Sequence, residues 1–171
     1  LYRASVYGNL DIMFPMITSV SEVQKVLEIC KTVREELQAE QIPYAEKMEL
    51  GIMIETPAAA IISDQLAPLV DFFSVGTNDL TQYTLACDRQ NPDIESFCDT
   101  HHEAILRLIA WSAKNAHEHG AWIGICGELA ADTSLTERFL RMGIDELSVS
   151  PTFVLKVRDA VRKVDLHTKE D

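Results

Sequence analysis

The sequence predicts an α/β fold in which parallel strands alternate with helices. Five short apolar runs, each suited to a buried strand, recur along the chain. Each run is followed by a segment in which apolar residues have helical spacing, and no hairpin turn joins one run directly to the next. Strands that are connected through helices run parallel, with right-handed crossovers. The pattern therefore indicates consecutive β/α units.

The boundaries of these elements follow from turn and capping residues. The strands are expected at residues 11–17, 49–55, 71–77, 122–126 and 146–150. Ser19 or Ser21 can cap the first helix, which extends to about residue 37, and Pro57 suits the first turn of a helix that extends to about residue 66. The other helices are expected at about 80–87, at 102–119, from 132 or 134 to 142, and at 151–164. A polar loop is expected at residues 88–100.

Two architectures fit such units, an open doubly wound sheet and part of a (β/α)8 barrel. Polar or reactive residues recur at the carboxyl ends of the expected strands, namely Glu55, Asn78, Asp79, Cys126 and Ser150. A barrel gathers its strand ends around one mouth, so we expect an incomplete (β/α)8 TIM barrel that holds about the last five β/α units. A complete barrel usually needs about 250 residues. Residues 1–171 are therefore expected to be the carboxyl-terminal part of one domain of a longer chain.

The composition narrows the possible functions. Of the 171 residues, 47% are hydrophobic, which is enough for one sizeable core. The net charge of −12 argues against binding to nucleic acid, which requires a basic surface. There is no apolar run of membrane-spanning length and no signal-peptide pattern, so we expect no membrane insertion. The four cysteines lie far apart without a CxxC pair, which predicts free thiols in a reducing, cytoplasmic environment.

Two carboxylates are expected at the ends of neighbouring strands, Glu55 and Asp79. They would repel each other unless a cation lies between them, and Mg²⁺ usually takes one or two carboxylates together with substrate phosphates or waters. Asn78 and Asp79 also lie at an expected helix start, which favours a phosphate, and Arg89 could bind the same anion through two hydrogen bonds. The alternative is that Asn78 or Asp79 is an ordinary helix cap and that Arg89 is a solvated charge.

Cys126 is the cysteine with a placement suited to chemistry. It ends a buried strand and precedes Gly127, so its thiol could give or take a proton at the mouth. The alternative is a small hydrophobic residue packed in the core. His117 and His119 are two residues apart on an expected helix and do not share a face, so we expect no zinc site there with Cys126.

Four stretches of the sequence resemble one known family. They are GIMIETPAAA (51–60), VDFFSVGTNDLTQYTLACDRQNP (70–92), WIGICGELAAD (122–132) and MGIDELSVSP (142–151). The resemblance is to the carboxyl-terminal part of enzyme I, the phosphoenolpyruvate–protein phosphotransferases of the bacterial sugar phosphotransferase system, and it covers nearly the whole chain. Pyruvate phosphate dikinase and phosphoenolpyruvate synthase share the GTNDLTQ and CGE signatures. TPAAA and YTLACDR are more similar to enzyme I.

The resemblance implies a cytoplasmic, homodimeric enzyme whose barrel binds phosphoenolpyruvate with Mg²⁺ for sugar uptake. Glu55 and Asp79 match the family's metal ligands, and Asn78, Asp79 and Arg89 match its phosphate-binding residues. Cys126 matches the residue that protonates the enolate carbon as pyruvate forms. The phosphoryl group would pass to a histidine on a separate amino-terminal domain and then to the carrier protein HPr.

Parts of the family's machinery have no match in this sequence. Neither His101 nor His102 matches the acceptor histidine, and the family's further substrate-binding arginines would precede Leu1. We therefore expect that this chain alone does not complete the reaction. A metal-dependent pyruvate aldolase would also use a barrel with a Glu–Asp metal pair, although it gives no role to Cys126. A non-catalytic dimerisation module would bind neither metal nor substrate.

Overall fold

The computed structural model describes residues 1–167, apart from the side chains of residues 95 and 96, and this part of the chain contains one parallel sheet. Its strands, in both chain order and sheet order, are β1 (Ile12–Phe14), β2 (Leu50–Ile54), β3 (Phe72–Gly76), β4 (Trp122–Cys126) and β5 (Glu146–Ser148). A doubly wound sheet reverses its strand order at a switch point, whereas the wall of a barrel does not. The observed order confirms the α/β prediction and agrees with a partial barrel.

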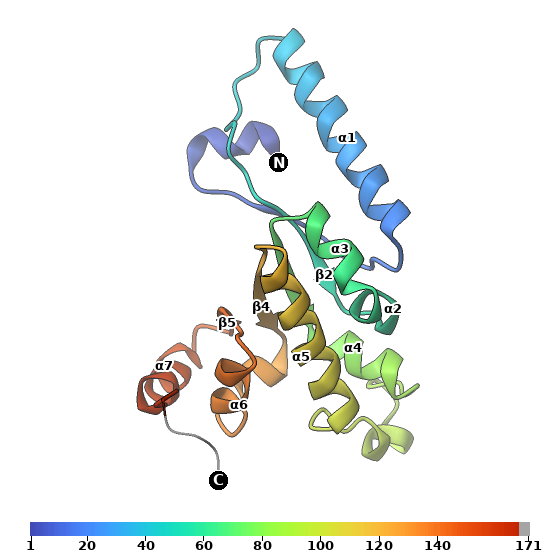
Figure 1. The fold of residues 1–171 in the computed structure, drawn as a ribbon, viewed down its shortest axis with the longest axis vertical. Helices are drawn as coiled ribbons and strands as arrows, with labels where there is room; N and C mark the ends of the chain where they lie inside the picture. The colour runs from blue at the N-terminus through green and yellow to red at the C-terminus, as the bar shows by residue number, and fades with distance from the viewer. Residues whose placement is uncertain (168–171) are drawn as a thin grey trace.

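The helices lie mainly on one side of this sheet. They are α1 (Val20–Ala39), α2 (Pro57–Ile61), α3 (Ser63–Leu66), α4 (Thr77–Thr84), α5 (Glu103–Glu118), α6 (Thr136–Arg141) and α7 (Val154–Lys163). Short 3-10 helices are η1 (Tyr2–Tyr7), η2 (Ala67–Leu69), η3 (Pro92–Phe97) and η4 (Glu128–Ala131). Figure 1 shows α2, α3 and α5 packed over the sheet, with α6 and α7 beyond β5. This is the helical outer layer that β/α units of a barrel place around their strands.

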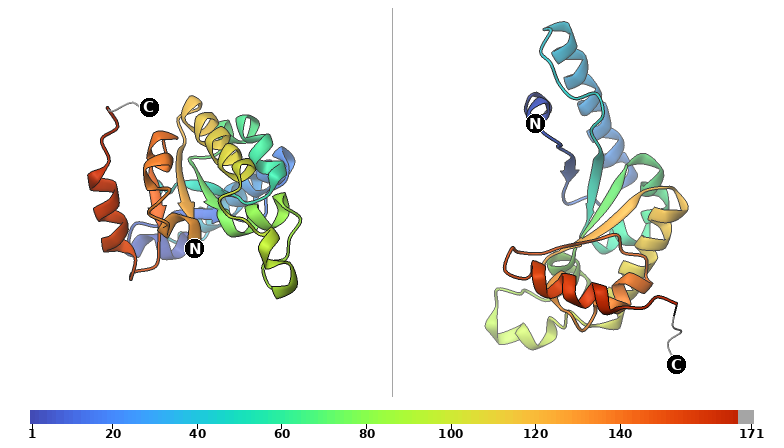
Figure 2. Two further views of the ribbon diagram at one scale, coloured as in Figure 1. Left: turned by 90° about the horizontal axis from the view of Figure 1, so that it is seen from below. Right: turned by 90° about the vertical axis from the view of Figure 1, so that its left-hand side faces the viewer.

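The core lies between the sheet and these helices. Side chains alternate along the three central strands, and six of those facing the helices are at most 1% exposed, namely Ile52, Ile54, Phe73, Val75, Ile123 and Ile125. A smaller apolar cluster, which includes Tyr2, Cys30 and Leu37, joins η1 to α1. Figure 2 shows that α1 and η1 extend beyond the end of the sheet. Within residues 1–167, the structure contains no helix long and apolar enough to cross a membrane.

Several element boundaries differ from those expected. The first strand ends at Phe14 because Met16 has a left-handed backbone, with φ 59°. Ser19, not Ser21, caps α1, and Glu22 completes a capping box with it. The helix expected at 57–66 is interrupted at Ile62, where α2 ends and α3 begins. The helix after β3 begins at Thr77, earlier than expected, so both Asn78 and Asp79 lie in its first turn.

Candidate functional site

The carboxyl ends of β2, β3, β4 and β5 lie along one edge of the sheet. Ile54 is paired with Val75, Gly76 with Cys126, and Cys126 with Ser148. Because the strands are parallel and in this register, the residues that follow them meet at the same edge. The structure therefore brings Glu55, the first turn of α4 and Cys126 to one edge of the sheet.

Glu55 is buried at this edge, with only 4% of its surface exposed. Its Oε1 accepts a hydrogen bond of 2.7 Å from the backbone N–H of Met16, which lies in the loop after β1. A buried carboxylate is costly unless it is hydrogen-bonded or bound to a cation. The Met16 contact satisfies one oxygen and ties the loop after β1 to the end of β2.

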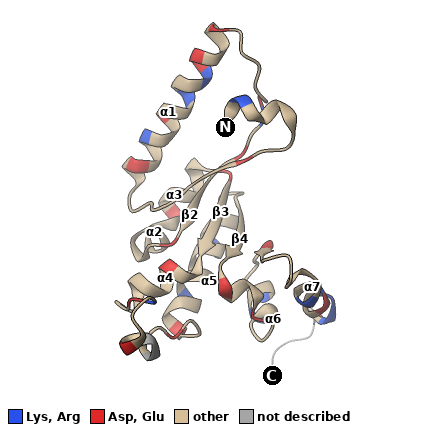
Figure 3. Ribbon diagram, turned by 180° about the vertical axis from the view of Figure 1, so that it is seen from behind, with Lys and Arg blue, Asp and Glu red and all other residues tan. Residues whose placement is uncertain are grey.

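Asp79 and Arg89 form an ion pair beside Glu55's strand. The distance between Arg89 Nη2 and Asp79 Oδ1 is 3.3 Å, and the two side chains are 43% and 32% exposed. The Arg89 backbone N–H also donates to Gln82 Oε1 of α4, at 3.3 Å. The structure therefore brings Asp79 and Arg89 together, two residues that the sequence analysis placed at one phosphate-binding site. In Figure 3 the Lys and Arg positions of α7 are separated from α4 by α5 and α6.

Asn78 connects α4 to the turn after β4. Its Oδ1 accepts a hydrogen bond of 3.4 Å from the backbone N–H of Glu128. Gly127, with φ 102°, makes that turn, and a Cβ on it would lie 2.7 Å from Thr77 Oγ1 and 3.2 Å from Asn78 Oδ1. Only glycine suits this close approach and this backbone conformation.

The Cys126 thiol is half-buried, and hydrogen bonds with residues of β3 hold it in place. Ser74 Oγ donates to Cys126 Sγ at 3.4 Å, and Cys126 Sγ donates to the carbonyl oxygen of Val75 at 3.4 Å. Thr77 Oγ1 donates to the carbonyl oxygen of Cys126 at 3.1 Å. Sequence reasoning did not identify Ser74 and Thr77. The available signal was that Ser74 is a polar residue within an otherwise apolar strand.

A cavity of about 280 Å³ opens beside these residues. Its lining includes Asn78, Arg89 and Glu128 from the site, and also Cys87 and Cys98. Cys87 and Cys98 form a disulfide, so the expectation that all four cysteines are free thiols is wrong. The polar loop that contains Arg89 folds back on itself through η3, which brings together two cysteines that are eleven residues apart. Cys30 and Cys126 are free, and Cys30 is buried.

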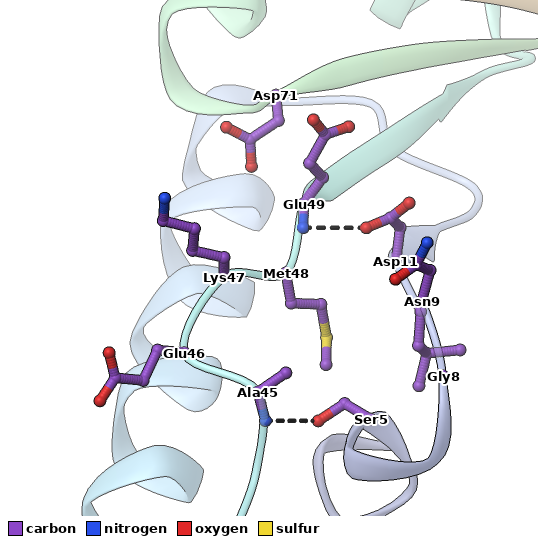
Figure 4. Close-up of a pocket in the computed structure, with 11 residues that line it drawn as sticks. Ser5, Gly8, Asn9, Asp11, Ala45, Glu46, Lys47, Met48, Glu49 and Asp71 are labelled. Carbon is purple, nitrogen blue, oxygen red and sulfur yellow. Dashed lines mark hydrogen bonds between the residues drawn. The ribbon is translucent and has the colours of Figure 1, made fainter.

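A larger cavity, of about 630 Å³, lies at the opposite ends of the strands. Figure 4 shows several acidic side chains around it. Asp11 accepts a hydrogen bond from the backbone N–H of Glu49, and Asp71 accepts one from that of Leu50. These carboxylates therefore hold the beginnings of the strands together. Asp11 and Asp71 therefore have a structural role, since they maintain the strand geometry at the amino-terminal face of the sheet.

Three histidines have polar partners outside the group Glu55, Asn78, Asp79, Arg89 and Cys126. His102 Nδ1 accepts a hydrogen bond from the backbone N–H of Ala104, and this contact caps α5. His101 Nε2 lies 2.7 Å from Asp132 Oδ2, and His117 Nε2 lies 2.9 Å from Asp145 Oδ2. Two hydrogen bonds from Ser134 hold the pKa of Asp132 below its ordinary value of 3.8. The contact with His101 lowers this pKa further, by a smaller amount.

The oxygen ligands at this edge fit Mg²⁺ in their chemistry. Glu55 and Asp79 carry carboxylates, which are the hard ligands that Mg²⁺ prefers, and one or two of them suffice when a substrate phosphate supplies the remainder. No cluster of three or more histidine, cysteine or acidic side chains suited to a metal occurs within residues 1–167.

Comparison with known proteins identifies similar sequences. Residues 1–166 match the family described as PEP-utilising enzyme, PEP-binding domain. The chain is 46% identical over 171 residues to the phosphoenolpyruvate-protein phosphotransferase of Lactococcus lactis subsp. cremoris, covering 100% of this chain and 30% of that protein. It is also 46% identical over 164 residues to the protein of the same name from Priestia megaterium, covering 96% of this chain and 29% of that protein. The chain thus spans about 30% of the length of these curated relatives.

Solved structures support the fold alone. A citrate lyase from Burkholderia xenovorans superposes with a TM-score of 0.70 at 19% sequence identity, over 94% of this chain and 51% of that one. The protein CitE from Mycobacterium tuberculosis, in complex with magnesium and acetate, has a TM-score of 0.60 at 14% identity, over 91% of this chain and 58% of that one.

Proposed function

The chain belongs to the PEP-utilising enzymes, as part of their PEP-binding domain, and from this premise we propose that it carries the phosphoenolpyruvate- and Mg²⁺-binding residues of a phosphoenolpyruvate–protein phosphotransferase. One observation supports this assignment most strongly. The residues that resemble the family's ligands, Glu55, Asn78, Asp79, Arg89 and Cys126, come from separate segments and meet at one edge of the sheet.

Each residue has a role that its position supports. Glu55 and Asp79 hold Mg²⁺, which when bound offsets phosphate charge. Arg89 and Asn78 bind the phosphate, and ligand binding would recruit Arg89 from its ion pair with Asp79. As the phosphoryl group leaves phosphoenolpyruvate for a histidine, the P–O bond breaks and a P–N bond forms. The Cys126 thiol then gives its proton to the enolate carbon, and pyruvate is released.

The remaining parts of the reaction lie in the longer proteins that this chain resembles. The acceptor histidine, HPr, a homodimeric assembly and a cytoplasmic location are proposed from family membership. In a cytosolic protein, the Cys87–Cys98 disulfide would be exposed to reduction. A relative of the dikinases and synthases, a pyruvate aldolase and a non-catalytic dimerisation module are the competing functions.

Calorimetric titration of phosphoenolpyruvate into the protein, with and without Mg²⁺, tests the proposal. We expect binding that requires Mg²⁺, that is lost in Asp79→Ala, and that is retained in Asp159→Ala, a control on the exposed face of α7. Circular dichroism would establish that each variant is folded. Binding of pyruvate without phosphoenolpyruvate would favour the aldolase. A folded protein that binds neither ligand nor Mg²⁺ would contradict the proposal for this chain.

A further inference from the structure

The Cys87–Cys98 disulfide closes the segment that carries Arg89. Cys87 lies after α4, Cys98 follows η3 directly, and Arg89 is two residues beyond Cys87, inside the closed segment. Both cysteines line the cavity of about 280 Å³ together with Arg89. The disulfide is therefore part of the wall of the candidate site, and it constrains the backbone on both sides of the candidate phosphate-binding arginine.

The closed segment has little packing of its own. From residue 88 to residue 97, none of the side chains that the structure describes is buried, and Figure 2 shows the part with η3 projecting from the sheet and its helices. Arg89 contacts α4 through its backbone N–H to Gln82 and through its side chain to Asp79, each at 3.3 Å. Segments with few buried contacts open at a low cost in free energy, so we expect the disulfide to supply much of the order of this one.

The turn into the segment also depends on a constraint. Ala86 has φ 52°, a left-handed conformation that is uncommon for alanine. The backbone N–H of Cys87 donates to the carbonyl oxygen of Gln82 at 3.1 Å, which forms a helix end where glycine is the usual left-handed residue. A strained conformation persists only where its surroundings hold it. The disulfide supplies such a constraint, because it begins at the residue after Ala86.

We propose that Cys87 and Cys98 form a reversible redox switch that orders or releases the Arg89 segment and thereby sets the affinity for phosphoenolpyruvate. The proposal rests on the proposed function, in which Arg89 binds the phosphate. In the disulfide form, Arg89 is held beside Asp79. In the dithiol form, the ligand must order the segment when it binds, and that loss of conformational entropy weakens binding.

The reductant is a small thiol of the glutathione class. Cys98 is half-buried whereas Cys87 is only 5% exposed, so Cys98 is the more accessible sulfur. A small thiolate attacks Cys98 Sγ, the S–S bond breaks, and Cys87 leaves as a thiolate that takes a proton. A second small thiol then displaces Cys98 from the mixed disulfide. The protein gains two electrons and two protons, and two small thiols become one small disulfide; oxidation is the reverse reaction.

Equilibration with mixtures of reduced and oxidised glutathione tests the switch without any substrate. Acid quenching, alkylation and mass spectrometry give the fraction of dithiol. A disulfide that serves only structure resists the glutathione pool, whereas we expect both forms at millimolar glutathione and full recovery of the bond on reoxidation. Hydrogen exchange of the amides at 88–97 should be severalfold faster in the dithiol form. Cys30→Ala should behave as the parent does, and the double variant Cys87→Ser, Cys98→Ser should exchange fast at every mixture.

Titration of phosphoenolpyruvate with Mg²⁺ into each form tests the link to the site. We expect the dithiol form and the double variant to bind about tenfold more weakly, which corresponds to ordering one backbone unit and one long side chain. Because coupling is reciprocal, saturating phosphoenolpyruvate should raise the ratio of squared thiol to disulfide concentration at half-reduction by the same factor.

The possible outcomes separate the switch from the proposed function. A bond that stays intact in every glutathione mixture, equal amide exchange in the two forms, or equal affinity of the two forms would overturn the proposal. Reversible reduction with faster exchange at 88–97, but no phosphoenolpyruvate binding by either folded form, would retain the switch in the segment and count against the proposed function.

Discussion

Glu55 and Gly76 lie in contact across the end of neighbouring strands. A Cβ placed on Gly76 would lie 2.9 Å from Glu55 Cβ, 3.1 Å from Glu55 Oε2 and 2.8 Å from Met53 Sδ. Contacts under 3.0 Å force a neighbouring atom to move. The absence of a side chain at position 76 therefore lets the buried Glu55 carboxylate occupy its place at the strand edge.

Replacement of Gly76 by alanine should displace Glu55 and strain the sheet. Overpacking of a core site typically costs about 1–3 kcal/mol, and we expect a loss of unfolding free energy in that range, together with weaker Mg²⁺-dependent ligand binding. Urea unfolding and calorimetry would measure the two effects. Gly8→Ala is the matched control, because a Cβ there has no atom within 4 Å and the backbone is extended. A Gly76→Ala variant as stable as the control would refute the steric argument.

Arg89→Lys separates ligand binding from stability. Lysine keeps the charge but loses the planar pair of donors, so we expect phosphoenolpyruvate affinity to fall about tenfold or more. The Arg89–Asp79 pair is partly exposed, and the unfolding free energy should therefore change by less than about 0.5 kcal/mol. Titration calorimetry and urea unfolding provide both values. Arg107→Lys on α5, which affects the exposed pair with Glu103, should leave affinity unchanged.

Reduction of the Cys87–Cys98 disulfide should destabilise the protein and loosen the loop that carries Arg89. The bond closes a loop with a sequence separation of 11, for which chain entropy predicts a stabilisation of about 3 kcal/mol. We expect the urea midpoint to fall on addition of a phosphine reductant, and ligand affinity to fall with it. The double variant Cys87→Ser, Cys98→Ser should start at the lower midpoint and show no response to reductant. A response of equal size in that variant would assign the effect to another group.

Asp132 should contribute stability that depends on pH. Its pKa in the folded protein is below the ordinary value of 3.8, mainly because Ser134 donates two hydrogen bonds to it. A lowered pKa means that the stabilisation from Asp132 is present above pH 3.8. It is lost as the pH falls through the pKa that Asp132 has in the folded protein. Asp132→Asn should therefore be less stable than the parent near neutral pH, and the two unfolding free energies should converge in acid. A gap between parent and Asp132→Asn that is constant with pH would contradict the assignment.

Local patterns in the sequence determined most of the fold. Apolar runs such as 49–55 and 122–126 specify strands that are buried on the helix side, and the recurrence of helices between them specifies a parallel sheet. Ser19 with Glu22 specifies a helix start through contacts within four residues. The strand-end residues Glu55 and Cys126 were predictable for the same reason, since a parallel sheet places consecutive strand ends at one edge.

Only the tertiary structure decided which of these residues touch. The Ser74–Cys126 contact joins residues 52 apart in the chain, and the Met16–Glu55 contact joins residues 39 apart. The pairing of Cys87 with Cys98 depends on how the loop between them folds, which their spacing does not indicate. Periodicity specifies the face on which a side chain lies, because it follows from backbone geometry within one element. Contacts between elements depend on strand register and loop path, which are set by packing of the whole core.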